Sequence, residues 1–456
     1  MSRTRKGEEV VKSLFGGSLY QQGRGFYVSL ELLAILRGSV MLEQREAEPG
    51  QAPPTTRVLP PPDRELRYLR PTHDFARRLM AGHFEDNPPP ESEAWLRGRT
   101  ERVLRSMLIG LHAPVPGRRR APSDWRKWHL YPYPADFIHY DALVRKGKIS
   151  VERDSYRGGG GLAHRILRTD TQVERLVEIR QRLRELLGDS SSALGELARA
   201  LTAHDAAQPE ADAEDRVEAD SQVFDSPWVE ALRAGVHRIL RRRDITDSKR
   251  VEAFMHWAPY CIARHQQHLA YAVLDPESAG RPPAGSPARA SVVDCQTEPG
   301  PIRELARRHL TESLNAIYRA LERRAEAEFA DESATLLGGS QKWREGPRTF
   351  FATTCFAVGA VSAPTGLRHF NLGAELLEAI VLATVEGQQP FESFCTDVLH
   401  DQLHLVADHR AAQLAGLYEV DQTRFERNGE ALAQSLLELG LLERYSDMTR
   451  MVGVRA

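Results

Sequence analysis

The sequence predicts a mainly α-helical protein that is built from several segments. Apolar residues recur every three or four positions over long stretches, for example from Ile302 to Leu321, and this spacing is typical of amphipathic helices. Between the helical patterns, stretches rich in proline, glycine or acidic residues have few large apolar side chains to bury. A chain of 456 residues is long enough for about two to four domains of ordinary size.

The N-terminal half is expected to contain a series of helices. The last of these patterns is the most regular, and Gly188 stands after it, at the position where helices often end. From Trp125 to Arg168 the texture changes, because aromatic residues, prolines and arginines interleave. The helical patterns cover residues 10–15, 29–36, 66–80, 93–111 and 176–187.

Helices are also expected at 228–242 and 248–274, and a long amphipathic helix starts at Ile302. The short apolar run from Phe350 to Val361 fits a buried strand or a buried helix, because periodicity alone does not separate the two. One face of the long helix carries arginines, and such a face is more often solvated than functional. These arginines are Arg303, Arg307, Arg308, Arg319, Arg323 and Arg324.

The composition shifts divide the chain into eight segments. In chain order they are an N-terminal helical unit (1–45), a proline-rich linker (46–63), a helical and basic aromatic region (64–203), an acidic linker (204–224), a helical region (225–274), a proline and glycine linker (275–301), the long amphipathic helix with an apolar segment (302–366) and a C-terminal module (367–456).

Overall composition excludes several classes of protein. The four cysteines are far apart and form no disulfide framework. The sequence has no apolar run of about 18 residues, and its polar start lacks the apolar core of a secretory signal. We therefore expect a cytoplasmic protein that does not enter a membrane. The 61 basic and 63 acidic residues leave a formal charge of −2, which indicates no particular partner.

Local charge is much less even than global charge. Residues 95–170 contain sixteen basic and seven acidic side chains, a net charge of +9. Residues 367–456 contain seven basic and fourteen acidic side chains, a net charge of −7. This asymmetry is compatible with a nucleic-acid surface in the first region and a protein-contacting or solvated surface in the second.

A basic aromatic block is the predicted nucleic-acid site. Arginines would contact phosphates, while flat rings beside them would stack on bases. The alternative is a surface turn whose tryptophans pack on the core. The predicted nucleic-acid-binding residues are Arg118, Arg119, Arg120, Trp125, Arg126, Lys127, Trp128, Arg157 and Arg165.

Four consecutive glycines at 158–161 lie between two of these arginines, Arg157 and Arg165. Backbone amides in such a run can approach an anion. The run lacks the Gly-Lys-Ser/Thr ending of a nucleotide-binding P-loop and the spacing of a dinucleotide fingerprint. We therefore expect a flexible turn that needs no ligand.

The chain ends with a helical pattern from Phe425 to Leu439, followed by Gly440, two leucines, a polar turn and a short apolar run at 449–454. This ending resembles the recognition helix and wing of winged-helix domains. The resemblance covers about residues 372–456 and implies a C-terminal winged-helix-like module. In it the glycine would end the helix and the polar turn would close a small hairpin.

The charge of this helix departs from the DNA-reading pattern. A winged helix that reads DNA presents Arg, Lys, Asn or Gln to phosphates and bases. Here the helix carries Glu426, Glu430 and Glu438, which would repel phosphates. A structural or protein-docking winged helix is therefore favoured over one that reads DNA. The helix residues able to contact DNA are Arg424, Arg427, Asn428 and Gln434.

A histidine cluster raises the alternative of a metal site. His400 and His404 would face one side of an α-helix with His409 nearby, and Asp401 or Asp408 would complete a zinc or iron set. The glutamate that follows the first histidine in metalloproteases is missing. The ordinary interpretation is the polar surface of a helix. No linear motif for hydrolytic chemistry is found, which leaves open a site assembled in space.

Together these features predict a nucleic-acid-associated accessory or scaffold subunit without catalytic activity or cofactor. It would contact nucleic acid through its basic region and a protein partner through its acidic end. In architecture it is similar to accessory proteins of bacterial multi-gene systems that handle DNA, including antiphage defence. Two alternatives stay open: a purely protein-binding assembly subunit, and a metal-dependent enzyme using His400, His404 and His409.

Overall fold

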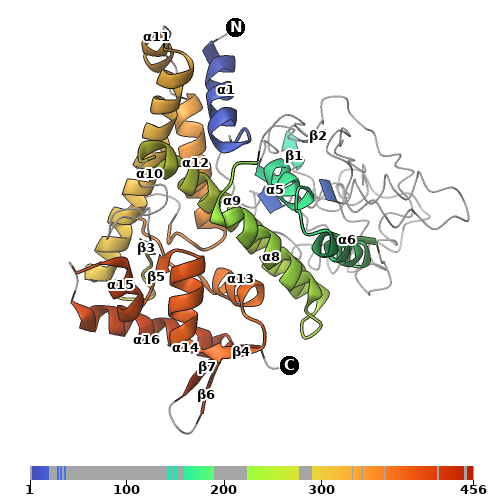
Figure 1. Cartoon of the computed structure of the whole chain (residues 1–456), viewed down its shortest axis with the longest axis vertical. Coiled ribbons are helices and arrows are strands. Elements are labelled where there is room, and N and C mark those ends of the chain that lie inside the picture. The colour runs from blue at the N-terminus through green and yellow to red at the C-terminus, as the bar shows by residue number, and fades with distance from the viewer. Residues whose placement is uncertain are drawn as a thin grey trace, which may run out of the picture. The chain divides into compact units, whose positions relative to one another are not determined.

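The computed structural model confirms the mainly α-helical class (Figure 1). Contacts divide the chain into two compact units, one made of Met1–Ser29, Arg157–Asp170 and Asp220–Ala456, and the other of Leu30–Tyr156 and Thr171–Ala219. The structure describes residues 3–19, 28–29, 31–32, 35–36, 142–145, 148–151, 159–188, 223–276, 290–330, 332–339, 342–363, 366–418, 421–445 and 449–454.

The first unit contains most of the described elements. Its helices are α1 (Arg3–Phe15), α5 (Gly159–Arg168), α8 (Pro227–Arg241), α9 (Asp247–Leu274), α10 (Pro301–Glu328), α11 (Ser333–Leu337), α12 (Lys342–Ala357), α13 (Ala374–Thr384), α14 (Phe391–Ser393), the π-helical segment η4 (Phe394–Gln402), α15 (His409–Ala415) and α16 (Gln422–Glu438). Its strands are β3 (Ser291–Val292), β4 (Gln388–Pro390), β5 (Leu405–Val406), β6 (Leu442–Arg444) and β7 (Arg450–Gly453).

The described part of the second unit consists of the helical residues 31–32 and 35–36, a hairpin and a longer helix. Strands β1 (Ala142–Arg145) and β2 (Lys148–Val151) pair antiparallel, with Arg145 opposite Lys148. Helix α6 (Val173–Gly188) confirms the regular pattern at 176–187 and ends at the expected glycine. The helices predicted at 66–80 and 93–111 lie outside the described residues.

Helix α9 is the element around which the first unit packs. It contacts α8, α10, α12 and α13 (Figure 1). The side chain of Thr246 caps α9 by accepting a hydrogen bond from the backbone N–H of Lys249. On α8, Gly235 faces Trp257 so closely that a Cβ would lie 2.1 Å from the indole nitrogen. A side chain at that glycine would therefore push α8 away from α9.

The glycine run is not a flexible turn where the structure describes it. Gly159, Gly160 and Gly161 form the first turn of α5 and are buried. A Cβ on Gly159 would lie 2.8 Å from the side chain of Val28 and 3.2 Å from that of Phe350. The apolar residues that follow in α5 are buried, and the lack of a side chain on the glycines lets the helix pack close to Val28 and Phe350. The free energy gained by this burial outweighs the weak helix propensity of glycine.

The apolar run at 350–361 is resolved as mostly helix. Its first part belongs to α12, which runs beside α10 (Figure 1). After α12 the chain forms an antiparallel bridge between Val361 and Phe370. Residues 290–294, expected to lie in the 275–301 linker, are instead buried and include β3, which pairs in parallel with β5. The partner of β3 is more than a hundred residues away, so local composition did not indicate this strand.

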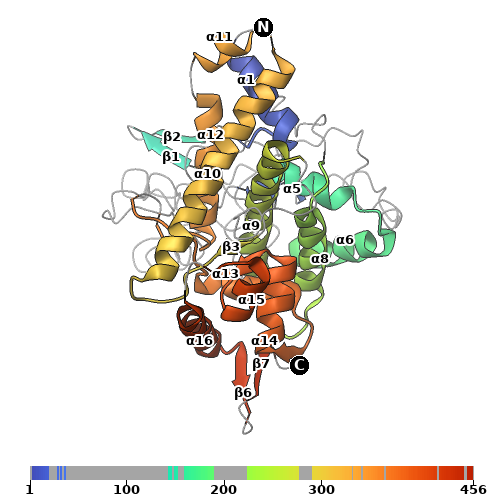
Figure 2. The same ribbon diagram turned by 60° about the vertical axis from the view of Figure 1, so that its left-hand side comes forward.

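The C-terminal module (residues 367–456) combines helices with a small antiparallel sheet. Its strands follow the order β4-β7-β6, and the hairpin of β6 and β7 directly follows α16 (Figure 2). Asn428 on α16 is fully buried and ties three chain segments together. Its Nδ2 donates to the carbonyls of Val293 and Ala407, and its Oδ1 accepts from the backbone N–H of Cys295.

In the part of the chain that the structure describes, no helix combines the length and the apolarity needed to cross a membrane.

Candidate functional site

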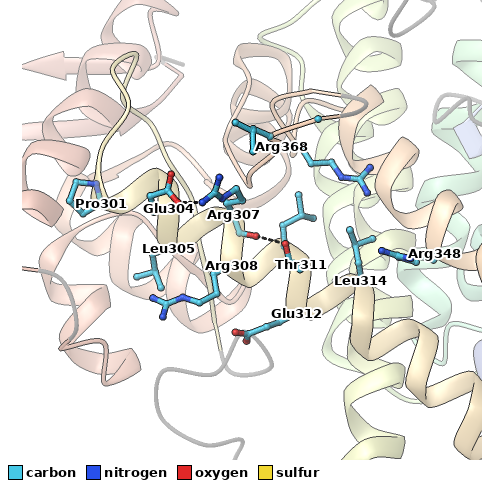
Figure 3. A pocket seen from close by; sticks show the side chains of 13 residues that line it. Pro301, Glu304, Leu305, Arg307, Arg308, Thr311, Glu312, Leu314, Arg348 and Arg368 are labelled. Atoms are coloured by element: carbon cyan, nitrogen blue, oxygen red, sulfur yellow. Dashed lines mark hydrogen bonds and ion pairs between the residues drawn. The ribbon is translucent and has the colours of Figure 1, made fainter.

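An arginine-lined hollow lies along the outer face of α10. It has a volume of about 990 Å³ and is bordered by α10, by Arg348 of α12 and by the loop segment 366–368 (Figure 3). We call it the arginine hollow. Its lining residues are Pro301, Glu304, Leu305, Arg307, Arg308, Leu310, Thr311, Glu312, Leu314, Arg348, Gly366, Leu367 and Arg368.

The sequence pattern of α10 explains why charged side chains line one face of it. Ile302, Leu305, Leu310 and Leu314 recur at helical spacing and are buried. The intervening polar positions, Arg307 among them, must then face away from the core. The prediction of a long amphipathic helix with an arginine face is confirmed by this arrangement.

Positive charge exceeds negative charge in the arginine hollow. Four arginines and two glutamates line it, which leaves two positive charges in excess. Arg307 forms an ion pair with Glu304, three residues earlier on the helix (Figure 3). Arg348 contacts Glu345 at 3.4 Å. These are pairs between half-exposed side chains on the same helix, and such pairs hold the cations weakly.

Arg368 experiences the excess charge most directly. Burial lowers the pKa of Arg368 below its ordinary value, and the positive charge of Arg348 lowers it further. Two like charges in one hollow destabilise each other, and an anion placed between them would relieve that repulsion. The arginine hollow is thus electrostatically suited to an anionic group such as a phosphate.

The arginine hollow also has apolar walls. Leu305, Leu310 and Leu314 border it from α10 but are almost wholly buried, so Leu367 on the loop, which is 79% exposed, supplies its accessible apolar surface. A large apolar side chain this exposed, next to arginines, offers a contact for the apolar part of a ligand. An anion that carries apolar or aromatic groups therefore fits better than a small inorganic ion.

Among the predicted nucleic-acid-binding residues, the structure describes Arg165. Arg118, Arg119, Arg120, Trp125, Arg126, Lys127, Trp128 and Arg157 lie outside the described residues. Arg165 is described, and it is buried in α5 with 5% of its surface exposed. Its guanidinium donates a hydrogen bond to the carbonyl of Gly16 at 3.2 Å. In this conformation Arg165 ties α5 to the end of α1 and presents no free surface to a nucleic acid.

The structure does not assemble the histidines into a metal set. The segment that carries His400 is π-helical and ends at Gln402, so His404 lies outside the helix with a left-handed φ of 51°. His400 instead contacts Asp401 at 2.6 Å. Among the described residues, no group of three or more His, Cys, Asp or Glu side chains is placed to hold a metal ion. The α-helical geometry expected for this pair was wrong, because the segment is π-helical and ends before His404.

The backbone and the ring of His404 both contact neighbouring residues of the protein. Its carbonyl accepts hydrogen bonds from the buried guanidinium of Arg264 and from the backbone N–H of Ser291. Its ring packs edge-on against Trp228, with 6.2 Å between ring centroids. Burial lowers the pKa of His404 to about 4, with a further contribution from Arg264, so the ring is neutral near pH 7.

On α16 and the β6–β7 hairpin, glutamates lie among exposed arginines, which include Arg424, Arg427 and Arg444. On the hairpin, Arg450 pairs with Glu430 at 2.7 Å and with Glu392 at 2.9 Å. It also lies over the ring of Phe391. Asn428, which we expected to be able to contact DNA, is buried. We refer to Glu392, Glu426, Glu430, Glu438 and Glu443 as the acidic face.

Sequence analysis did not place Arg348 and Arg368 in a site. The first is on α12 and the second is in a loop, and α10 brings them together only in three dimensions. The one local signal was the arginine face of α10. Comparison of the chain with protein-family models, with curated proteins and with solved structures finds no match.

Proposed function

We propose that this protein is a nucleic-acid-associated assembly subunit that contacts phosphates through the arginine hollow. The observation that carries the proposal is the excess of arginines over carboxylates around one large hollow beside an exposed leucine. Phosphate neutralisation by arginines supplies much of the affinity of proteins for nucleic acids. The basic block at 118–128, which lies outside the described residues, is proposed as a second set of phosphate contacts.

The C-terminal module supplies the second part of the proposal. The succession of α16 and the β6–β7 hairpin follows the order that the winged-helix resemblance implies, and β4 adds a third strand. Its acidic face is poorly suited to phosphates around Arg450, because that arginine is already paired with two carboxylates. We propose a winged-helix-like module that docks a protein partner, as in cytoplasmic complexes that handle DNA in bacteria, including antiphage defence.

Fluorescence anisotropy of labelled single- and double-stranded DNA and RNA tests the first part, at several salt concentrations. The hollow variant changes Arg307, Arg308, Arg348 and Arg368 to alanine. We expect its affinity to fall by about 100-fold or more at about 0.1 M salt, and the salt dependence to become shallower. A second variant with Arg118, Arg119, Arg120, Arg126 and Lys127 changed to alanine measures the share of the basic block.

A matched control variant separates a local effect from one of net charge. It changes four exposed arginines of the C-terminal module, Arg410, Arg424, Arg427 and Arg444, to alanine. Its net charge equals that of the hollow variant, so both have lost the same non-specific attraction. Equal losses of affinity in the two variants would contradict the proposal.

The second candidate function is a purely protein-binding assembly subunit. It is favoured by the exposure of Leu367 at the rim of the arginine hollow, because an acidic protein surface with apolar groups would also fit there. If the protein binds no nucleic acid even at low salt, this candidate replaces the first.

A further inference from the structure

A serine, a histidine and an aspartate form a chain of contacts at the surface of the first unit. The Oγ of Ser362 lies 3.0 Å from the Nδ1 of His369, and the Nε2 of His369 lies 3.4 Å from the Oδ2 of Asp294. Ser362 is exposed, whereas His369 and Asp294 are buried. An accessible hydroxyl backed by a buried imidazole and a buried carboxylate is the arrangement that activates serine nucleophiles.

Backbone pairing holds the three residues in register. The backbone N–H of Ser362 donates to the carbonyl of His369, and Val361 bridges Phe370. Asp294 bridges Asn371 in parallel, and its N–H donates to the carbonyl of Phe370 at 3.0 Å. The carboxylate is thereby brought beside the histidine from a segment about seventy residues earlier. This long-range pairing fixes the geometry in a way that a mobile surface loop would not.

The Asp294 carboxylate is buried and accepts hydrogen bonds from two neighbouring groups. Its side chain is 1% exposed, and it accepts hydrogen bonds from Arg303 Nε at 2.6 Å and from the backbone N–H of Gln296 at 3.1 Å. A carboxylate facing Nε2 favours the tautomer with the proton on that nitrogen. In this tautomer Nδ1 is unprotonated and accepts the hydrogen bond of the Ser362 hydroxyl.

The same surroundings keep the imidazole neutral. Burial lowers the pKa of His369, the Asp294 carboxylate opposes this shift, and Arg303 adds to it. Glu304 on α10 acts in the same direction as Asp294. A histidine that is neutral near pH 7 can take a proton from a serine hydroxyl.

We propose that Ser362, His369 and Asp294 form an acyl-transfer site that hydrolyses carboxylic esters carrying an anionic group. The oxygen of Ser362 attacks the ester carbonyl while its proton passes to Nδ1 of His369. That proton then moves to the departing alkoxide, so an alcohol leaves and an acyl-serine remains. Water, deprotonated by the same nitrogen, hydrolyses the acyl-serine and restores the hydroxyl.

The preference for an anionic substrate follows from the loop between the two reacting residues. Gly366, Leu367 and Arg368 of this loop border the arginine hollow. An ester whose acyl chain or alcohol ends in a carboxylate or phosphate would place that group toward Arg368. Arg303 contacts Asp294 and not the serine, so it is a positioning residue. This activity does not depend on nucleic-acid binding, and either proposal can fail without the other.

A fluorophosphonate probe, which labels activated serines, tests the proposal on the full chain. We expect about one equivalent of label per chain on the peptide that contains Ser362. Labelling should vanish in Ser362→Ala and slow by about 100-fold or more in Asp294→Asn. Ser333→Ala, a change to another surface-accessible serine, is the matched control and should label like the wild type. No labelling of the wild type, or equal labelling of Ser362→Ala, would overturn the proposal.

Two further measurements separate catalysis from a structural role. The labelling rate should rise with pH to a plateau whose midpoint lies below 6.5, and Arg303→Gln should move that midpoint upward. Ser362→Cys keeps the site testable if Asp294→Asn fails to fold, because the substituted thiol should react with iodoacetamide at least about tenfold faster than free cysteine at pH 7. A Ser362→Cys thiol that reacts with iodoacetamide no faster than free cysteine would contradict an activated site. A labelling rate that does not change between pH 5 and 8 would contradict it as well.

Discussion

The arginine hollow and the acidic face both present arginines, but they differ in what surrounds them. In the arginine hollow, four arginines share the space with two carboxylates, and burial together with the positive charge of Arg348 lowers the pKa of Arg368. On the acidic face, Arg450 lies between Glu392 and Glu430 and over a phenylalanine ring. In the first region the lining arginines outnumber the lining carboxylates, while in the second the arginine lies between two carboxylates.

This difference teaches that the number of arginines in a segment does not locate a phosphate-binding surface. The net charge of −7 for residues 367–456 correctly describes the acidic face, yet Arg368 from that same segment lines the arginine hollow. What decides the function of an arginine is the balance of charges within a few ångströms of its guanidinium.

The largest expected effect concerns the attachment of the acidic face to the rest of the first unit. Asn428→Ala removes three hydrogen bonds and leaves the N–H of Cys295 and the carbonyls of Val293 and Ala407 buried without their partner. We expect the free energy of unfolding to fall by about 3 kcal/mol or more. Chemical denaturation checks this, with exposed Gln434→Ala on the same helix as the control. An unchanged denaturation midpoint would contradict the role of Asn428.

The second prediction concerns acid, which should weaken the region around β5. The folded-state pKa of His404 is about 4 and its ordinary value is 6.5, so folding favours the neutral ring. The contribution of the neutral His404 ring to the free energy of unfolding is complete above pH 6.5 and is lost as the pH falls from 6.5 to 4. At pH 5 the free energy of unfolding is lower by about 2 kcal/mol than at neutral pH. His404→Asn, which suits the left-handed backbone, should reduce this loss in denaturation curves at pH 7 and 5. Equal acid sensitivity of the variant and the wild type would refute it.

The third prediction separates the two arginine environments. Arg450→Ala should lower the free energy of unfolding by about 1 kcal/mol, because it leaves Glu392 and Glu430 beside each other and removes the contact with Phe391. The affinity for a polyanion should stay unchanged, because this arginine is already neutralised. Thermal unfolding and heparin binding measure the two effects. A clear loss of heparin affinity would break the distinction between the two regions.

The smallest effect is expected in the arginine hollow itself. Changing Glu304 and Glu312 to glutamine removes the two lining carboxylates and should raise the affinity for a polyanion by about threefold at low salt. The same substitution at Glu326 and Glu375, which are exposed and do not line the hollow, is the control for net charge. A gain of equal size in both variants would show that the hollow has no special role in binding.

The sequence predicted much of the fold but little of the candidate sites. Helical periodicity located α6, α8, α9 and α10, because each buries an apolar stripe that is readable from local spacing. It did not locate β3, whose partner β5 is distant in sequence. It also suggested a flexible glycine turn where α5 begins, because the contacts of Gly159 with Val28 and Phe350 are long-range.

The candidate sites were missed for the same physical reason. Ser362, His369 and Asp294 match no linear motif, and only the pairing of 294 with 371 brings the carboxylate to the histidine. Arg348 and Arg368 line the same hollow because α12 and the loop segment 366–368 both lie beside α10. His400 and His404 do not form the expected pair, because the π-helical segment rotates successive residues by a different angle from an α-helix. This segment also ends at Gln402, between the two histidines.

Photo-crosslinking of a bound oligonucleotide, followed by mass spectrometry, tests the central claim most directly. Bromodeoxyuridine placed along a short single strand reports which surface of the full-length chain lies against the nucleic acid. The account predicts crosslinked peptides from residues 301–314, from the segment around Arg348 and from residues 366–368. Crosslinks confined to α16 and the β6–β7 hairpin would contradict it, since the acidic face would then be the nucleic-acid surface.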